Sequence, residues 1–194
     1  MTPEREKKFK EVISRRQPDL TIILENIHDP HNISAILRSC DAVGMMEVYV
    51  INTQDPNRRK KLGKKSSASA RKWVEVNYFE NVASCANELK NKGFSIWATH
   101  LTTDAVSLYD LELSKPTALA FGNEHEGVSE ELLSYADGNF IIPMMGMIPS
   151  LNVSVACAVS LYEAYRQRVA IGNYDKPLLA PDVVDKLFKE WEEK

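Results

Sequence analysis

The chain has 194 residues, of which 44% are hydrophobic, and this is enough for one globular domain with its own core. No apolar run reaches the length needed to cross a bilayer, and the N-terminal sequence MTPEREKKFK lacks the apolar core of a signal peptide, so we expect a cytoplasmic protein without membrane contact. The net charge of -3 hides an asymmetry, because residues 1–72 carry 15 Lys and Arg against 9 Asp and Glu, whereas residues 73–194 carry 9 against 18.

Basic clusters in an otherwise acidic chain indicate a polyanionic partner such as RNA, with a merely solvated surface as the alternative. The residues that we expect to contact RNA are Arg5, Lys8, Arg15, Arg16, Arg58, Arg59, Lys60, Lys64 and Arg71.

The chain holds no pattern typical of a metal site or a disulfide framework. His28 and His31 flank Pro30 without a carboxylate or cysteine at ligand spacing. The three cysteines are widely spaced among apolar neighbours, which predicts small buried thiols at Cys40, Cys85 and Cys157.

The first third of the chain predicts a strand, a helix and a second strand. A mainly polar helix over 3–16 should lie outside the core, and LTIILE at 20–25 is typical of a buried strand. The segment NISAILRSCDAVG has apolar residues at helical spacing, with Asn32 expected at its N-cap and Gly44 as its stop. The strand EVYVIN at 47–52 follows after a short connection, which predicts a parallel pair.

The middle of the chain continues the alternation of strands and helices. The segment QDPNRRKKLGKKSSASARK has little to bury and predicts a mobile basic loop, and WVEV from Trp73 predicts an edge strand. A helix over 81–92 and a strand over 94–100 follow.

The last third contains two strand ends that carry glycine or polar residues. The strand 117–121 breaks at Gly122, and Ser129 is the expected N-cap of the next helix. A short strand ending near Ile141 leads through a Met, Gly and Pro turn to Ser150 and Asn152, which precede a helix from Val153. The simplest role of these two residues is helix capping. An amphipathic helix containing Val184, Leu187, Phe188 and Trp191 ends the chain.

Three strand ends therefore carry motifs, in the order N-I-S-A-I-L-R, F-G-N-E-H-E-G-V and I-P-M-x-G-x-x-P-S-L-N-V-S-V-A. Over roughly residues 20–165 this ordered set resembles the SpoU/TrmH family of RNA 2'-O-ribose methyltransferases in the SPOUT superfamily. The resemblance implies an α/β parallel-sheet fold with a C-terminal trefoil knot, S-adenosylmethionine as cofactor and a homodimer. The expected parts are a basic N-terminal helix at 1–18, the methyltransferase domain at 19–165 and a C-terminal helical extension at 166–194.

The resemblance also implies the roles of single residues. Those matching the catalytic motif positions are Asn32, Arg38, Glu124, Ser150 and Asn152. The cofactor is expected against Thr99, Leu101, Gly122, Ile142, Met144 and Leu151. The basic N-terminal arm and the terminal helices look like the subgroup that methylates a guanosine ribose in the tRNA D-loop.

Arg38 is a poor base because arginine stays protonated in proteins, so we expect it to stabilise the developing alkoxide or to hold a phosphate. The alternative functions are methylation of another tRNA or ribosomal RNA site, and RNA binding without catalysis. A nucleotide-dependent reductase is disfavoured, because no G-x-G-x-x-G follows the first strand.

Overall fold

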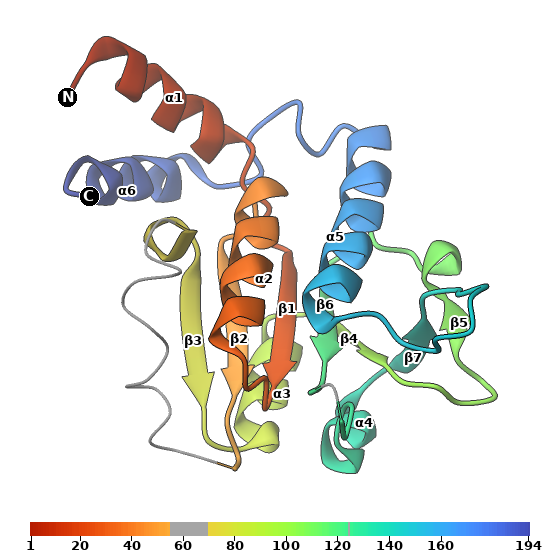
Figure 1. The fold of residues 1–194 in the computed structure, drawn as a ribbon. Coiled ribbons are helices and arrows are strands. Elements are labelled where there is room, and N and C mark those ends of the chain that lie inside the picture. The colour runs from red at the N-terminus through yellow and green to blue at the C-terminus, as the bar shows by residue number, and fades with distance from the viewer. Residues whose placement is uncertain (55–69, 124) are drawn as a thin grey trace.

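The computed structural model describes residues 1–54, 70–123 and 125–194, and it shows a seven-stranded sheet with helices on both faces (Figure 1). All described strand pairs are parallel, in the order β3-β2-β1-β6-β4-β7-β5. The strands are β1 (Leu20–Glu25), β2 (Glu47–Ile51), β3 (Glu75–Phe79), β4 (Ser95–Thr99), β5 (Val106–Ser107), β6 (Thr117–Phe121) and β7 (Gly138–Ile141). The predicted parallel α/β fold and the edge position of β3 are confirmed.

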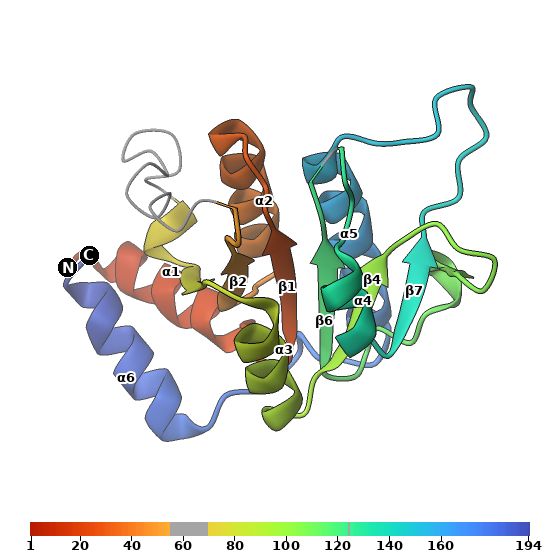
Figure 2. The same cartoon turned by 90° about the horizontal axis from the view of Figure 1, so that it is seen from below.

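Helices cover the sheet in two layers, because buried parallel strands need an apolar partner on each face. In Figure 2, α2 and α5 lie side by side on one face and α3 and α4 lie on the other. Each layer closes its own cluster of buried apolar side chains against the sheet. The helices are α1 (Pro3–Ser14), α2 (Pro30–Ala42), α3 (Val82–Asn91), α4 (Glu130–Tyr135), α5 (Val153–Ala170) and α6 (Pro181–Glu192), with 3-10 turns η2 (Ala70–Lys72) and η3 (Leu108–Asp110).

Strand β7 lies between β4 and β5, although it follows β6 in the chain. In the sheet, β4 therefore lies between β6 and β7, the two strands that this part of the chain connects. This order is compatible with the trefoil knot that the resemblance implied, and the knot itself stays a prediction.

The two terminal helices pack against each other beside the sheet, which changes the expectation that the first helix lies outside any core. Phe9 and Ile13 of α1 are buried together with Trp191 of α6. The Phe9 and Trp191 rings meet edge to face with centroids 5.5 Å apart, and the Trp73 and Trp191 rings at 4.7 Å. The termini therefore share a small aromatic core of their own.

Two other expectations concern the chain as a whole. Helix α5 continues to Ala170, so the expected domain boundary between residues 165 and 166 falls inside a helix. Among the described residues, no helix combines the length and the apolar character of a membrane span.

Candidate functional site

A hollow of about 470 Å³ lies at the carboxyl ends of β4 and β7, the edge of a parallel sheet where ligands bind. Figure 2 shows the segment that joins β7 to α5 reaching away from the sheet beside this edge. Of the six residues expected to hold the cofactor, five line the hollow, and Ser150 lines it too. The five are Thr99, Leu101, Ile142, Met144 and Leu151.

The lining of this hollow is mainly apolar, with few polar groups. Phe140, Ile142 and Leu151 supply flat or branched apolar surface, whereas Thr99, His100 and Ser150 supply polar atoms. Thr99 is held in place because its hydroxyl donates to the carbonyl of Ala120 at 3.0 Å. Such a lining fits a ligand that has an apolar ring system and a polar sugar or amino-acid part.

Asn152 connects the last motif to the first. Its side-chain oxygen accepts from the backbone N–H of Ser154 at 2.8 Å, so it caps α5 as predicted. Its side-chain nitrogen donates to the Asn32 oxygen at 3.1 Å, although the two residues are 120 positions apart. Asn152 therefore both starts a helix and fixes the position of a residue from another motif.

The helix that carries Asn32 starts earlier than predicted. Asp29 is the N-cap, since its carboxylate accepts from the backbone N–H of His31 at 2.8 Å. Asn32 then lies inside the first turn and is 9% exposed. Its side chain is thereby available for Asn152 rather than for capping, so the N-cap prediction for Asn32 is wrong.

Further along α2 and α5 from these two asparagines, fully buried thiols join the two helices. Cys40 and Cys157 are both inaccessible to solvent, and their side chains hydrogen-bond to each other. Burial, reinforced by this contact, raises the pKa of Cys40 well above that of an ordinary thiol. Cys40 therefore stays neutral, and both side chains act as packing between the helices. All three cysteines are buried, which confirms the buried thiols expected from the sequence.

Gly122 does not line the hollow, and position 122 requires glycine for another reason. A Cβ at residue 122 would lie 1.8 Å from the carbonyl oxygen of Gly127. The loop folds back because Asn123 accepts from the backbone N–H groups of His125 and Glu126 at 2.9 and 2.7 Å. Gly122 is thus required by the close approach of its own chain. Glu124 lies outside the described residues.

The sequence did not single out Glu25, which fixes this loop to the sheet. Glu25 is 2% exposed, and its carboxylate accepts from the Ser129 N–H at 2.8 Å and from the Ser129 hydroxyl at 2.6 Å. Ser129 also caps α4 as predicted, accepting from Leu132 N–H at 3.1 Å. The only sequence signal was a carboxylate at the end of an otherwise apolar strand, where burial requires a partner.

Arg38 is exposed on α2 and is not brought to the last motif within one chain. It lines a shallow hollow together with Asp41, Ala70 and Trp73, on the side of α2 that faces η2. Among the described residues, no hydrogen bond or ion pair joins Arg38 to Ser150 or Asn152. Its catalytic role therefore stays a prediction, and the single chain does not show how Arg38 would reach Ser150 and Asn152.

Apart from Arg16, the residues expected to contact RNA fall into three groups. Arg5, Lys8 and Arg15 are exposed along α1, and Arg71 is half-buried, donating to the Tyr78 hydroxyl at 2.5 Å. Residues 58, 59, 60 and 64, and the basic loop that contains them, lie outside the described part of the chain.

Arg16 is a correction to the expected RNA surface. It is 1% exposed, donates to the Met45 carbonyl at 2.8 Å and to Asp41 at 2.9 Å, and lies over the Trp191 ring at 5.0 Å. Burial lowers the pKa of Arg16, and the adjacent Asp41 opposes that shift. Its partners compensate the buried charge inside the protein. The residue therefore anchors the terminal helices instead of forming part of the surface.

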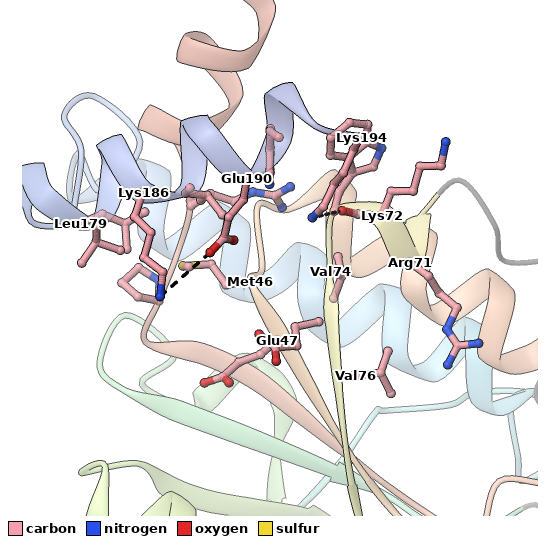
Figure 3. Close-up of a pocket in the computed structure, with 17 residues that line it drawn as sticks. Met46, Glu47, Arg71, Lys72, Val74, Val76, Leu179, Lys186, Glu190 and Lys194 are labelled. Carbon is pink, nitrogen blue, oxygen red and sulfur yellow. Dashed lines mark hydrogen bonds and ion pairs between the residues drawn. The ribbon is translucent and has the colours of Figure 1, made fainter. Parts of the chain in front are cut away.

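A larger hollow of about 850 Å³ lies between α6 and the starts of β2 and β3 (Figure 3). Its lining mixes opposite charges, with Lys186 3.9 Å from Glu190 and Lys194 donating to the Lys72 carbonyl at 2.7 Å. Since it opens at the amino ends of the strands, it is separate from the hollow at β4 and β7.

The motifs and the fold agree with the comparisons with known proteins. The SpoU rRNA Methylase family matches residues 19–162. A tRNA (guanosine(18)-2'-O)-methyltransferase of Thermus thermophilus is 46% identical over 190 residues, covering 98% of this chain and 96% of the relative. The crystal structure of an A. aeolicus TrmH/SpoU tRNA modifying enzyme superposes with a TM-score of 0.89 at 39% identity, covering 98% of this chain and 95% of that one.

A more distant structure is described as an AdoMet-bound rRNA methyltransferase from Sinorhizobium meliloti. It superposes with a TM-score of 0.67 at 26% identity and covers 81% of this chain and 59% of that one. The chain described here therefore belongs to the SpoU methylase family.

Proposed function

We propose that this protein transfers a methyl group from S-adenosylmethionine to the ribose 2'-hydroxyl of guanosine 18 in tRNA, in the cytoplasm. The observation that carries the proposal is the joining of Asn32 to Asn152 beside the hollow at β4 and β7. The full-length relative with this activity supports the choice of substrate.

The lining of the hollow fits the cofactor. Its volume of about 470 Å³ is within the range of small-molecule sites, roughly 300–1,000 Å³. Apolar walls at Leu101, Ile142 and Leu151 suit an adenine ring, and Thr99 and Ser150 supply polar groups for the sugar and amino-acid parts. S-adenosylmethionine supplies an electrophilic methyl group bonded to a sulfonium.

The residues of the chain position the acceptor hydroxyl. Because methyl transfer is an in-line displacement, the ribose oxygen must be aligned within about 3–3.5 Å of the methyl carbon. Ser150, from the lining of the hollow, and the linked amides of Asn32 and Asn152 are placed to orient the ribose. The hydroxyl proton leaves to water or to an RNA phosphate, while a guanidinium stabilises the oxygen as its charge develops.

A homodimer gives Arg38 a way to reach this site. Helix α5 exposes an apolar stripe with a spacing of seven residues, at Val155, Tyr162 and Val169, which are 47%, 53% and 46% exposed. The nearby loop exposes Met145 and Met147 almost completely. Contiguous exposed apolar surface is typical of an interface. We therefore assign the completing guanidinium to Arg38 of a second copy.

The activity is tested by incubating the protein with labelled S-adenosylmethionine and a transcribed tRNA, and by mapping the methylated ribose. The matched control tRNA carries 2'-deoxyguanosine at position 18 and should accept no label. Calorimetric titration with the cofactor should show binding to one site per chain. Cofactor binding without methylation of tRNA would contradict the proposal, and absence of both would favour an RNA-binding protein.

The role of Arg38 is tested by mixing two inactive variants, Arg38→Ala and Asn152→Ala. If Arg38 acts across the dimer, a mixed dimer holds one intact site and activity returns. The control mixture contains Arg38→Ala and the double variant Arg38→Ala/Asn152→Ala, and it should stay inactive. Restoration in neither mixture would place Arg38 and Asn152 in the same chain's site.

A further inference from the structure

A chain of polar side chains links three loops at the carboxyl edge of the sheet. The His28 ring nitrogen Nε2 lies 2.9 Å from the Gln54 side-chain oxygen, and the Gln54 side-chain nitrogen donates to the Glu126 carboxylate at 2.9 Å. Asn123 also donates to Glu126, at 3.3 Å. His28, Gln54 and Glu126 follow β1, β2 and β6 respectively, so residues distant in the sequence meet at one place.

This polar chain lies next to the proposed methyl-transfer site and is not part of it. Strand β6 separates β1 from β4, whose end borders the cofactor hollow. Adjacent strands are about 4.8 Å apart, so the loops after β6 and β1 lie within roughly 10 Å of the end of β4. Figure 2, seen from below, shows β2, β1, β6 and β4 following one another in this order. That distance matches the reach of a nucleoside from its ribose to the far edge of its base.

The same edge keeps hydrogen-bonding capacity that the protein does not use. Glu126 and Gln54 are exposed, and one carboxylate oxygen of Glu126 accepts the bonds from both Gln54 and Asn123. Asn52 is 6% exposed, and its side-chain nitrogen has no partner among the described residues. An unpaired buried donor is costly, so its presence at this edge favours a site completed by another molecule.

We propose that Glu126 reads the base of the nucleotide whose ribose is methylated, and that Gln54 positions Glu126 for this contact. The inference rests on the proposed function, since it assumes that the ribose lies at Asn32 and Asn152. Guanine presents two adjacent donors, N1–H and N2–H, on its Watson–Crick edge, and a carboxylate accepts both side by side. Gln54, from the loop after β2, and Asn123, from the loop of Glu126 itself, both donate to one oxygen of the Glu126 carboxylate. These two bonds orient the carboxylate.

The arrangement discriminates between bases by charge as well as by hydrogen bonding. Adenine places a lone pair at N1 where guanine has a donor, so the carboxylate repels it. Inosine keeps N1–H and lacks only the amino group at C2. Inosine therefore isolates one of the two contacts without changing the ribose or the phosphates.

The experiment compares methyl transfer to tRNA carrying guanosine or inosine at the modified position. We expect the wild-type protein to prefer guanosine by about tenfold in kcat/KM, as one charge-assisted hydrogen bond at an exposed site predicts. Glu126→Ala should bring this ratio close to one, chiefly by lowering the rate on guanosine. Gln54→Ala should lower the ratio in the same direction, with the rate on inosine nearly unchanged.

The matched control is Glu130→Gln, which removes an exposed carboxylate from the first turn of α4 and should keep the wild-type ratio. Thermal unfolding and cofactor titration establish that each variant is folded. A wild-type ratio near one, or a ratio unchanged in Glu126→Ala, would overturn the inference while leaving the methyltransferase function in place. Absence of methyl transfer to either tRNA by the wild-type protein would instead overturn the proposed function.

Discussion

Asn152 uses one side chain for two different contacts. Its side-chain oxygen caps α5 and its side-chain nitrogen bonds to Asn32. Substitutions can therefore separate the effect of the helix cap from that of the bond to Asn32. Asn152→Ser keeps a good capping oxygen but is too short to reach Asn32, whereas Asn152→Ala removes both contacts.

We expect Asn152→Ser to unfold near the wild-type temperature. Its rate of methyl transfer should fall by about ten- to a hundredfold, because an oriented polar group is lost. Asn152→Ala should in addition be about 1 kcal/mol less stable. Denaturant unfolding and single-turnover kinetics measure the two effects. Full activity in Asn152→Ser would show that the link to Asn32 has no catalytic use.

Glu163 gives the protein a pH-dependent contribution to its stability. It is 7% exposed on α5 and accepts two bonds from Arg166, at 2.9 and 2.7 Å, and one from Gln167. The hydrogen bonds from Arg166 are the largest cause and lower the pKa of Glu163. Burial opposes this shift, and the bond from Gln167 adds a smaller lowering. A lowered pKa means that the folded state holds the carboxylate more strongly than the unfolded state does.

This contribution is therefore complete above the unfolded pKa of about 4.3 and is lost as the pH falls through the lower folded value. Glu163→Gln should lower the free energy of unfolding by about 1 kcal/mol at pH 7, because Arg166 would then bond to a neutral amide. The loss is no larger because much of Arg166 is exposed to water. The difference from wild type should shrink below about pH 4. Urea unfolding at pH 7 and pH 3.5 measures it, and an equal difference at both values would refute the assignment.

At the scale of elements, Arg168 connects α5 to the start of β1 and to the segment before β6. Its side chain is fully buried and donates to the Asp19 carboxylate at 2.5 Å, to Gln17 at 3.1 Å and to the carbonyls of Leu113, Asp19 and Lys115. The guanidinium thereby satisfies groups from two separate segments, 17–19 and 113–115. Removing it leaves buried carbonyls and a carboxylate without donors.

We expect Arg168→Met, which keeps most of the volume, to lower the free energy of unfolding by about 3–5 kcal/mol. The control is Arg166→Met, two positions away with 67% of its side chain exposed, which should lower the free energy of unfolding far less. Guanidinium denaturation measures both. Equal effects of the two substitutions would show that the buried network has no special weight.

Periodicity and helix-end residues predicted most elements, because those signals are local. Ser129 and Asn152 cap helices as expected, and Gly44 ends α2 with a positive φ of 80°. Local signals could not reveal which charges are buried, since Arg16 stands among basic residues and its partners Met45 and Asp41 are far along the chain. The two-residue β5 is likewise too short to leave a pattern.

The sequence brought together residues that line one hollow, but it did not give their geometry. The resemblance pointed to five residues that line one hollow, because motifs at strand ends meet at one edge of a parallel sheet. It could not show that Gly122 is needed by its own loop, or that Arg38 faces η2. These facts depend on how elements pack, which a motif does not encode.

At the scale of the whole molecule, the apolar stripe of α5 is the feature that the single chain leaves unexplained. Val155, Tyr162 and Val169 are exposed on one face of a helix whose other face is buried in the core. If two copies cover this stripe, the protein should sediment with twice its chain mass of 21.9 kDa at micromolar concentration.

Tyr162→Glu places a charge in the proposed interface, where an unpaired carboxylate is desolvated. We expect the dimer dissociation constant to rise at least about a hundredfold. Methyl transfer should fall with the dimer population, because in our proposal each site needs Arg38 of the other copy. Val183→Glu, an equally abrupt change at a 37% exposed position on α6, is the matched control and should leave the dimer intact. Analytical ultracentrifugation and kinetics over a range of protein concentrations distinguish the outcomes. A wild-type protein that is fully active as a monomer would refute both the dimer and the shared site, because an arginine that acts from the second copy cannot serve a chain that is alone.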